Sequence, residues 1–258
     1  MTTCHCCSGR CKKCGRFQNL NGIVQRFKCT RCGKSFSETQ TLDGIRVDRN
    51  KAIQVVELLA ETVGIRAAAR LTRLDQGTVL RILESAGEHC ARLLDEKIQN
   101  VAVQCVQADE VFSYVYCKPD EYNRNDPERG EMWTFLSVAK KEKLIINYRV
   151  SKRTGDDATE FLTDLKSRLA NRIQLVTDSF RGYVAVSGPN GAVQNVFGAD
   201  CDYATETKRI TKDKNYTGQR AYFAPKHVTV KRQSRFGAPD MSTATTNHAE
   251  RTNLQPLR

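Results

Sequence analysis

Three acidic residues in the second half of the sequence have the types and positions needed to bind metal ions together. Asp109 follows the apolar run VAVQCVQA, Asp178 follows IQLVT, and Glu250 lies in the segment TTNHAERTNLQ. Carboxylates at neighbouring strand ends repel one another unless a cation lies between them, and Mg²⁺ takes one or two carboxylates together with water and phosphate oxygens. The pattern predicts a site for two Mg²⁺ or Mn²⁺ ions, about 3.5–4 Å apart, that supports displacement at a phosphodiester. Glu110 ranks below Asp109 because neighbouring residues of a strand point to opposite faces.

A second group of candidate ligands lies near the N-terminus, where seven of the eleven cysteines fall within the first 32 residues. Six of them form three C-x-x-C pairs, which are Cys4 with Cys7, Cys11 with Cys14, and Cys29 with Cys32. A C-x-x-C turn presents two thiolates on one side of a tight loop, which is half of a tetrahedral zinc site. Such a small zinc ribbon does not fold without its metal, so we expect a structural Zn²⁺.

The pair Cys29 and Cys32 is the strongest candidate, because Gly33 directly after it can adopt the positive φ that such a turn often needs. The other half of the zinc site stays open at this point. Spacing alone accepts either of the two earlier pairs, and His5 competes with them as a ligand.

The elements that must position these residues begin with a helical segment between residues 50 and 97. Its apolar residues recur at helical spacing, and Ile53 and Val56 are expected on the inner face of the first helix. The elements expected next are a short helix over 65–71, a turn over 72–75 and a further helix over 76–85.

A short helix, a tight turn and a second helix have the geometry of a helix-turn-helix. In that geometry Gln76, Thr78 and Arg81, at the start of the second helix, would face the groove of DNA. The residues expected to face inward are Val79, Ile82 and Leu83. The alternative is an ordinary three-helix packing unit.

After residue 100 the pattern changes to alternating strands and helices. Strand candidates are VAVQCVQADE, WTFLSVA, LIINYRV and IQLVT, and GDDATEFLTDLKSRL is a helix with Asp156 or Asp157 as its cap. The order of three strands, a helix and a strand is that of a ribonuclease H-like fold, which places Asp109 and Asp178 side by side at one edge of the sheet. The predicted fold class is therefore α/β, a ribonuclease H-like mixed sheet preceded by a zinc ribbon and a helix-turn-helix module. The predicted domains are 1–45, 46–98 and 99–258.

The charge of the chain indicates its partner. The 258 residues carry a net charge of +12, with +7 in residues 1–50, +7 in residues 204–258 and −2 between them. Two basic ends favour a polyanion, most simply double-stranded DNA, and the basic stretch Lys226–Arg235 either follows DNA beside the site or forms a solvated loop. No apolar window is long enough to span a membrane and the N-terminus lacks the apolar region of a secretory signal, so we expect a cytoplasmic protein with no membrane partner.

Four blocks of the sequence, taken together, resemble the insertion-sequence-one family of bacterial DDE transposases, particularly its longer single-frame members. The blocks, which extend over essentially the whole chain, are CHCC…QRFKCTRCGKSF, LDEKIQNVAVQCVQADEVFSYV, LVTDSFRGY and APKHVTVKRQSRFGAPDMSTATTNHAERTNL. The resemblance implies a zinc finger, a helix-turn-helix, a ribonuclease H-like catalytic domain, and transposition of an element with short terminal inverted repeats.

The resemblance also implies roles for individual residues and partners. The family's catalytic acids fall on Asp109, Asp178 and Glu250, and its leading cysteine pair falls on Cys4 and Cys7, which would complete the zinc site of Cys29 and Cys32. The implied partners are double-stranded DNA, as element ends and as target, and further copies of the chain in a homo-oligomer on DNA. The implied location is the bacterial cytoplasm, at the nucleoid when bound to DNA.

The chain departs from this family after Glu250. Relatives continue as a long basic helix with a further Arg or Lys near the site, whereas this sequence has Pro256 at that place and ends at Arg258. Because proline does not continue a helix interior, we expect a truncated or frameshifted copy with intact DNA binding and impaired strand transfer.

Two other functions fit parts of the sequence. A non-catalytic DNA-binding protein, such as a repressor of its parent element, would use the zinc ribbon and the helix-turn-helix and keep the acidic domain as a scaffold. A metal-dependent nuclease acting in repair or on RNA accounts for the catalytic fold but not for two DNA-binding modules.

Overall fold

The computed structural model describes residues 3–4, 6–19, 22–37, 47–118, 126, 128–184, 191–212 and 226–254. The chain divides into two compact units, Met1–Arg92 and Leu93–Arg258. The division falls within helix α3 (Gln76–Lys97). The boundary predicted from the sequence, after residue 98, lies just beyond the end of this helix. The predicted boundary after residue 45 lies outside the described residues. No helix in the described part of the chain is both long enough and apolar enough to cross a membrane.

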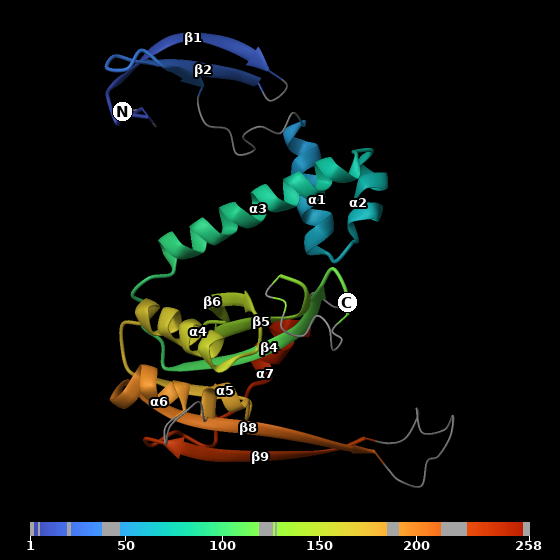
Figure 1. Ribbon diagram of the computed structural model, residues 1–258, viewed down its shortest axis with the longest axis vertical. Helices are drawn as coiled ribbons and strands as arrows, with labels where there is room; N and C mark the ends of the chain where they lie inside the picture. Colours follow the sequence, from blue (N-terminus) through green and yellow to red (C-terminus); the bar gives the residue numbers. More distant parts are fainter. Residues whose placement is uncertain are drawn as a thin grey trace. The chain divides into compact units, whose positions relative to one another are not determined.

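The first unit contains a small antiparallel sheet with the order β1-β2-β3 (Figure 1). Its strands are β1 (Cys11–Asn19), β2 (Gly22–Cys29) and β3 (Ser35–Ser37). Val24 and Phe27 of β2 are buried, whereas most other side chains of the sheet are exposed or half-buried. Gly33 has the expected positive φ, +71°, in the turn between β2 and β3.

Helices follow the small sheet in the described residues of the first unit, and α1 (Arg49–Ala60) comes first. Ala52 and Val55 form its buried face, in a core with small residues of the next helix. Ile53 and Val56, expected on the inner face, are 46% and 41% exposed, so that prediction was wrong. Residues three apart lie on the same side of a helix, so Ala52 with Val55 and Ile53 with Val56 form two neighbouring stripes along α1. The helices that pack against α1 decide which of these stripes is buried.

The turn between the second and third helices lies where the sequence predicts it. Helix α2 (Ile65–Thr72) ends at Arg73, which has the left-handed conformation common at helix ends, with φ of 56°. Helix α3 starts at Gln76, and the Asp75 carboxylate accepts a hydrogen bond from the backbone N–H of Gly77 at 2.8 Å.

Helix α3 is longer than predicted, since it continues past Ser85 to Lys97. Val79 and Ile82 are buried as expected, but Leu83 is 41% exposed. The prediction for Leu83 was wrong because the core of this unit takes only a narrow stripe of α3.

The second unit is an α/β structure built on a six-stranded mixed sheet (Figure 1). The strand order is β6-β5-β4-β7-β8-β9, with β4 parallel to β7, β7 parallel to β8, and the other neighbours antiparallel. The strands are β4 (Cys105–Val115), β5 (Gly130–Ala139), β6 (Leu144–Ser151), β7 (Ile173–Thr177), β8 (Cys201–Lys212) and β9 (Lys226–Phe236). The helices are α4 (Gly155–Arg168), α5 (Arg181–Val184), α6 (Ala192–Phe197) and α7 (Asn247–Leu254), with a 3₁₀ turn η1 (Gly198–Asp200).

The two faces of this sheet bury different residues, because alternate residues of a strand point to opposite sides. Leu175 and Tyr203 belong to the main core, which includes buried residues of α4, α5 and α6. Val176 and Ala204, each one residue further along, pack on the other face with Ala244, which precedes α7.

The same alternation places the two adjacent acids of β4 on opposite faces. Val106 and Ala108 lie in the main core on the α4 side, and Cys105 packs against the second cluster. Asp109 therefore shares the α7 side, and Glu110 shares the α4 side, as the sequence predicts.

The predicted order of three strands, a helix and a strand is present as β4, β5, β6, α4 and β7. Strand β4 does not end at the acids but runs on to Val115, because its antiparallel pairing with β5 continues to that residue. Helix α4 is capped by Thr154, which forms a reciprocal capping box with Asp157, and not by one of the two aspartates. That prediction missed the preceding threonine.

The basic stretch Lys226–Arg235 belongs to the edge strand β9 and is not a loop. Its partner β8 was not predicted. Pro256 and Arg258, on which the expectation of a shortened final helix rests, lie outside the described residues.

Candidate functional site

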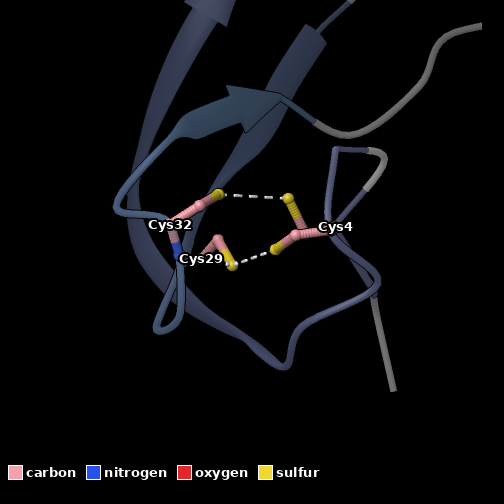
Figure 2. Close-up of side chains that lie close together, drawn as sticks. Cys4, Cys29 and Cys32 are labelled. Atoms are coloured by element: carbon pink, nitrogen blue, oxygen red, sulfur yellow. Dashed lines mark hydrogen bonds between the residues drawn. The ribbon is translucent and has the colours of Figure 1, made fainter.

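Four cysteine thiols come together beside the small sheet of the first unit. The sulfur atoms of Cys4, Cys7, Cys29 and Cys32 all lie within 4.8 Å of one another. The sulfurs of Cys4 and Cys32 are 3.6 Å apart and point toward one another (Figure 2), and those of Cys7 and Cys29 are 3.5 Å apart. Tetrahedral zinc with Zn–S bonds of about 2.3 Å sets its sulfurs about 3.8 Å apart, so this cluster could hold a structural metal such as zinc.

The arrangement decides which earlier pair joins Cys29 and Cys32. Cys11 and Cys14 lie on the extended strand β1, where residues three apart do not share a tight turn. Cys14 is exposed, and the Cys11 thiol donates to the carbonyl oxygen of Gly9 at 3.5 Å. The pair is therefore Cys4 and Cys7. His5 lies outside the described residues.

Backbone N–H groups around the cluster favour the thiolate form, which is the form that binds metal. The Cys29 sulfur accepts hydrogen bonds from the N–H groups of Cys32, at 3.5 Å, and Arg31, at 3.3 Å. These bonds lower the pKa of Cys29 to about 6. A backbone hydrogen bond from Cys6 likewise lowers the pKa of Cys4. At Cys7 and Cys32 burial and the neighbouring thiols outweigh the backbone hydrogen bonds and raise the pKa, to about 12 for Cys7.

The three predicted acids, Asp109, Asp178 and Glu250, line one open cavity of about 620 Å³ in the second unit. They come from β4, from the residue after β7, and from α7. The other lining residues are Arg153, Ser179, Phe180, Arg181, Glu206, Thr207, Lys208 and Thr246. Segments far apart in the sequence thus bring acidic and basic side chains to the same place.

Parallel pairing of β4 and β7 places the two aspartates together. Gln107 pairs with Val176, so Asp109 and Asp178 lie at the same level two residues further on. Burial raises the pKa of Asp178, although the N–H of Phe180, which donates to its carboxylate at 2.8 Å, opposes this effect.

Gln107, a fully buried glutamine, fixes the helix that carries Glu250. Its side-chain oxygen accepts hydrogen bonds from the N–H groups of His248, at 2.8 Å, and Ala249, at 3.2 Å. These N–H groups belong to the first turn of α7 and have no partner within the helix. The side-chain nitrogen donates to the Thr245 hydroxyl at 3.2 Å. Gln107 therefore links β4 directly to the start of α7.

Arg153 is held between two aromatic rings at the edge of the cavity. Its guanidinium carbon lies 4.3 Å from the ring centre of Trp133 and 4.2 Å from that of Phe180. The same side chain donates to Glu110 at 2.9 Å and to Asp178 at 3.3 Å. Stacking and ion pairing together fix this cation beside one of the three acids.

Glu110 is the buried partner of this arginine, with a side chain only 1% exposed. Burial, reinforced by the charge of Asp178, raises the pKa of Glu110 to about 7 despite the opposing effects of the Tyr183 hydroxyl and Arg153. Glu110 is connected to the cavity through Arg153.

The donor chemistry of the cavity fits Mg²⁺, since carboxylate oxygens are the ligands that hard cations take. In the structure, however, Asp178 is paired with Arg153, and Glu250 is paired with Lys208 at 2.7 Å. Among the described residues the three carboxylates do not form one compact ligand cluster, as the four thiols do. A divalent cation at these acids would have to replace existing ion pairs.

The residues predicted to face DNA lie at the start of α3. Gln76 and Arg81 are exposed and Thr78 is half-buried, and the Arg81 guanidinium donates to the Thr78 hydroxyl at 3.4 Å. Basic residues on and beside the small sheet are also exposed, namely Lys12, Lys13, Arg16, Arg26, Lys28, Arg31 and Lys34. Exposed Lys and Arg side chains are those that reach phosphates.

Sequence reasoning missed three residues of this site, Gln107, Arg153 and Lys208. Only Gln107 carried a signal, as a polar residue inside the apolar run VAVQCVQA. Arg153 and Lys208 are single basic residues whose partners lie 25 and 42 positions away, so only the folded sheet brings them to the acids.

Comparison with known proteins identifies no relative: no protein-family model matches the chain, and no curated protein matches its sequence significantly.

Proposed function

We propose that this protein is a transposase similar to the insertion-sequence-one family, which binds the ends of a mobile element and catalyses strand cleavage and strand transfer. The observation that carries the proposal is the single cavity lined by Asp109, Asp178 and Glu250. The sequence pattern alone predicts these three acids as metal ligands, and they come from three separate parts of the fold.

The architecture of the second unit supports a ribonuclease H-like assignment. Three antiparallel strands, β4 to β6, are followed by α4 and by β7, which returns parallel to β4. Asp109, Asp178 and Glu250 would hold Mg²⁺, which would supply positive charge for displacement at a phosphodiester. The chain's own residues fix the geometry: Gln107 positions α7 with Glu250, and Arg153 orients Asp178.

The first unit supplies features suited to binding double-stranded DNA. We infer that Cys4, Cys7, Cys29 and Cys32 bind Zn²⁺, which stabilises a zinc ribbon whose exposed basic residues contact phosphates. Helices α2 and α3 then act as a helix-turn-helix, with Gln76, Thr78 and Arg81 at the groove. Because contacts to phosphates would dominate the affinity of this unit for DNA, that affinity should fall steeply as the salt concentration rises.

A second candidate function is that of a non-catalytic DNA-binding derivative that represses its element. One observation favours it: Asp178 and Glu250 are each paired with a basic side chain of the same cavity. In that case the second unit would serve as a scaffold and the carboxylates would be neutralised permanently.

The test compares the wild-type chain with Asp109→Asn on DNA taken from both sides of the gene. If the protein is a transposase, the wild type cleaves this DNA with added Mg²⁺ and joins a 3′ end to target DNA, and Asp109→Asn abolishes both steps without weakening DNA binding. Asp156→Asn, an exposed acid of α4 outside the cavity, is the matched control and should keep full activity. Binding without cleavage by the wild type would instead support the repressor.

A further inference from the structure

Lys208 is the basic side chain that pairs with Glu250, whose carboxylate also accepts a hydrogen bond from the Thr246 hydroxyl at 2.6 Å. From strand β8 its ammonium donates to both carboxylate oxygens of Glu250 at 2.7 Å and to the side-chain oxygen of Asn247 at 2.9 Å. An ammonium has three N–H donors, so these three acceptors use all of them. The Lys208 side chain is 27% exposed and lines the cavity, so it has room to move away from Glu250.

The neighbouring acid, Glu206, has a second cationic partner besides Lys208. Glu206 lies 3.4 Å from the Lys208 ammonium and accepts a hydrogen bond from Arg232 at 2.9 Å. Burial alone would raise the pKa of Glu206, but hydrogen bonds from Arg232 and the N–H of Thr246, together with Lys208, lower it below its ordinary value. If Lys208 moved away, Glu206 would keep Arg232 as its partner, whereas Glu250 would need another cation.

A divalent cation and the ammonium compete for the Glu250 carboxylate. Its two oxygens offer about four lone-pair sites, of which Lys208 uses two and the Thr246 hydroxyl one, so a Mg²⁺ ion about 2.0–2.1 Å from an oxygen would lie next to the ammonium. Two cations on one carboxylate also repel each other strongly in a partly buried site. Occupation of Glu250 by a metal therefore means release of Lys208.

We propose that Lys208 alternates between two anionic partners, the Glu250 carboxylate and a phosphate of the DNA strand in the same cavity, and that a divalent cation at Glu250 drives the exchange. This inference rests on the proposed function, because it requires a metal and a nucleic-acid strand at these acids. It assigns Lys208 as a positioning residue that couples metal binding to DNA binding.

The first experiment measures Mn²⁺ binding by the zinc-loaded, full-length protein from the paramagnetic resonance of free Mn²⁺. Lys208→Met keeps most of the aliphatic side chain but removes the competing charge, and we expect Mn²⁺ to bind about tenfold more tightly. Lys231→Met, on the adjacent strand β9, removes the same charge from an exposed position and is expected to change Mn²⁺ affinity little. Lys208→Arg retains the charge and should behave like the wild type.

Glu250→Gln separates failure of this inference from failure of the proposed function. If wild-type Mn²⁺ binding depends on Glu250 but Lys208→Met leaves it unchanged, the exchange is wrong and the proposed metal site stands. If no Mn²⁺ binding depends on Glu250 in any variant, both the proposed metal chemistry and the exchange are wrong.

The second experiment measures DNA affinity with Ca²⁺ and without added divalent cation. With Ca²⁺, Lys208→Met should bind DNA about fivefold more weakly than the wild type. Its slope of log affinity against log salt concentration should be smaller by about one phosphate contact. Without the cation it should bind like the wild type, because Lys208 is then held by Glu250. Lys231→Met should have the same effect in both conditions. An equal loss for Lys208→Met with and without Ca²⁺ would overturn the exchange.

Discussion

Arg153 shows how strongly one side chain of this protein is constrained. Its guanidinium plane is covered by Trp133 and Phe180, and its edge bridges Glu110 and Asp178. Both carboxylates accept hydrogen bonds from the same nitrogen, Nη2, while the planar guanidinium stacks on the two rings, and a lysine ammonium has no plane with which to stack. The position therefore discriminates between two residues that usually substitute for one another.

We predict that Arg153→Lys lowers the Mg²⁺-dependent cleavage rate by about 10²-fold, because Asp178 loses its fixed orientation while a positive charge remains. DNA affinity should stay within about twofold of the wild type. Arg153→Gln, which also leaves Glu110 without its charged donor, should further lower the free energy of unfolding by about 2 kcal/mol. Single-turnover cleavage over a range of Mg²⁺ concentrations and thermal melts of the same samples measure the two effects.

The matched control is Arg149→Lys on strand β6, whose arginine pairs with acids of α4 away from the cavity. It should cleave at the wild-type rate. Full activity in Arg153→Lys would show that stacking and bridging by Arg153 do not position Asp178.

Among the structural elements, helix α7 depends most on a single residue outside itself. Backbone N–H groups of its first turn donate to the side-chain oxygen of Gln107 of β4, and Glu250 lies in that same helix. A sheet residue thus sets the position of a helix that follows it by about 140 residues in the chain. The distance between Glu250 and the two aspartates depends on this connection.

Gln107→Leu is predicted to leave the N–H groups of His248 and Ala249 buried without an acceptor, at a cost of about 1–3 kcal/mol in the free energy of unfolding. Cleavage should fall by about 10²-fold because Glu250 is displaced. Gln104→Leu, an exposed glutamine just before β4, is the control and should change neither quantity. Chemical denaturation and a cleavage assay give both values, and a stable, fully active Gln107→Leu would refute the role of Gln107.

Elements with a strong local pattern were predictable from the sequence, and elements that depend on distant partners were not. The apolar runs before Asp109 and Asp178 predicted two neighbouring strands, which β4 and β7 form. Strand β8 has the polar sequence CDYATETKRITK, whose strand character depends on β7 and β9 at its two sides. The site followed the same rule: Asp109 and Asp178 could be found because each follows an apolar run, but Arg153 and Lys208 could not, because sheet register alone brings them to the acids.

At the scale of the whole molecule, the two units have separate cores. The buried cluster of the first unit is formed by residues of α1 to α3 with Val47, and the clusters of the second unit share no residue with it. The small sheet that carries the four cysteines buries little beyond Val24 and Phe27. A sheet with so small a core needs another source of stability, and metal binding by thiolates is sufficient to provide it.

We therefore predict that Cys29→Ser, in the full chain, abolishes zinc binding and unfolds strands β1 to β3 but leaves the thermal transition of the second unit unchanged. DNA affinity should fall by about tenfold or more, because the exposed basic residues of the small sheet lose their fixed positions. Zinc content, a thermal scan and DNA binding at two salt concentrations measure these effects. Cys14→Ser, which changes an exposed cysteine outside the cluster, should keep zinc, stability and DNA affinity. If Cys29→Ser lowered the melting temperature of the second unit as well, the two units would have to fold as one, and the proposal that the first unit binds DNA while the second catalyses would be wrong.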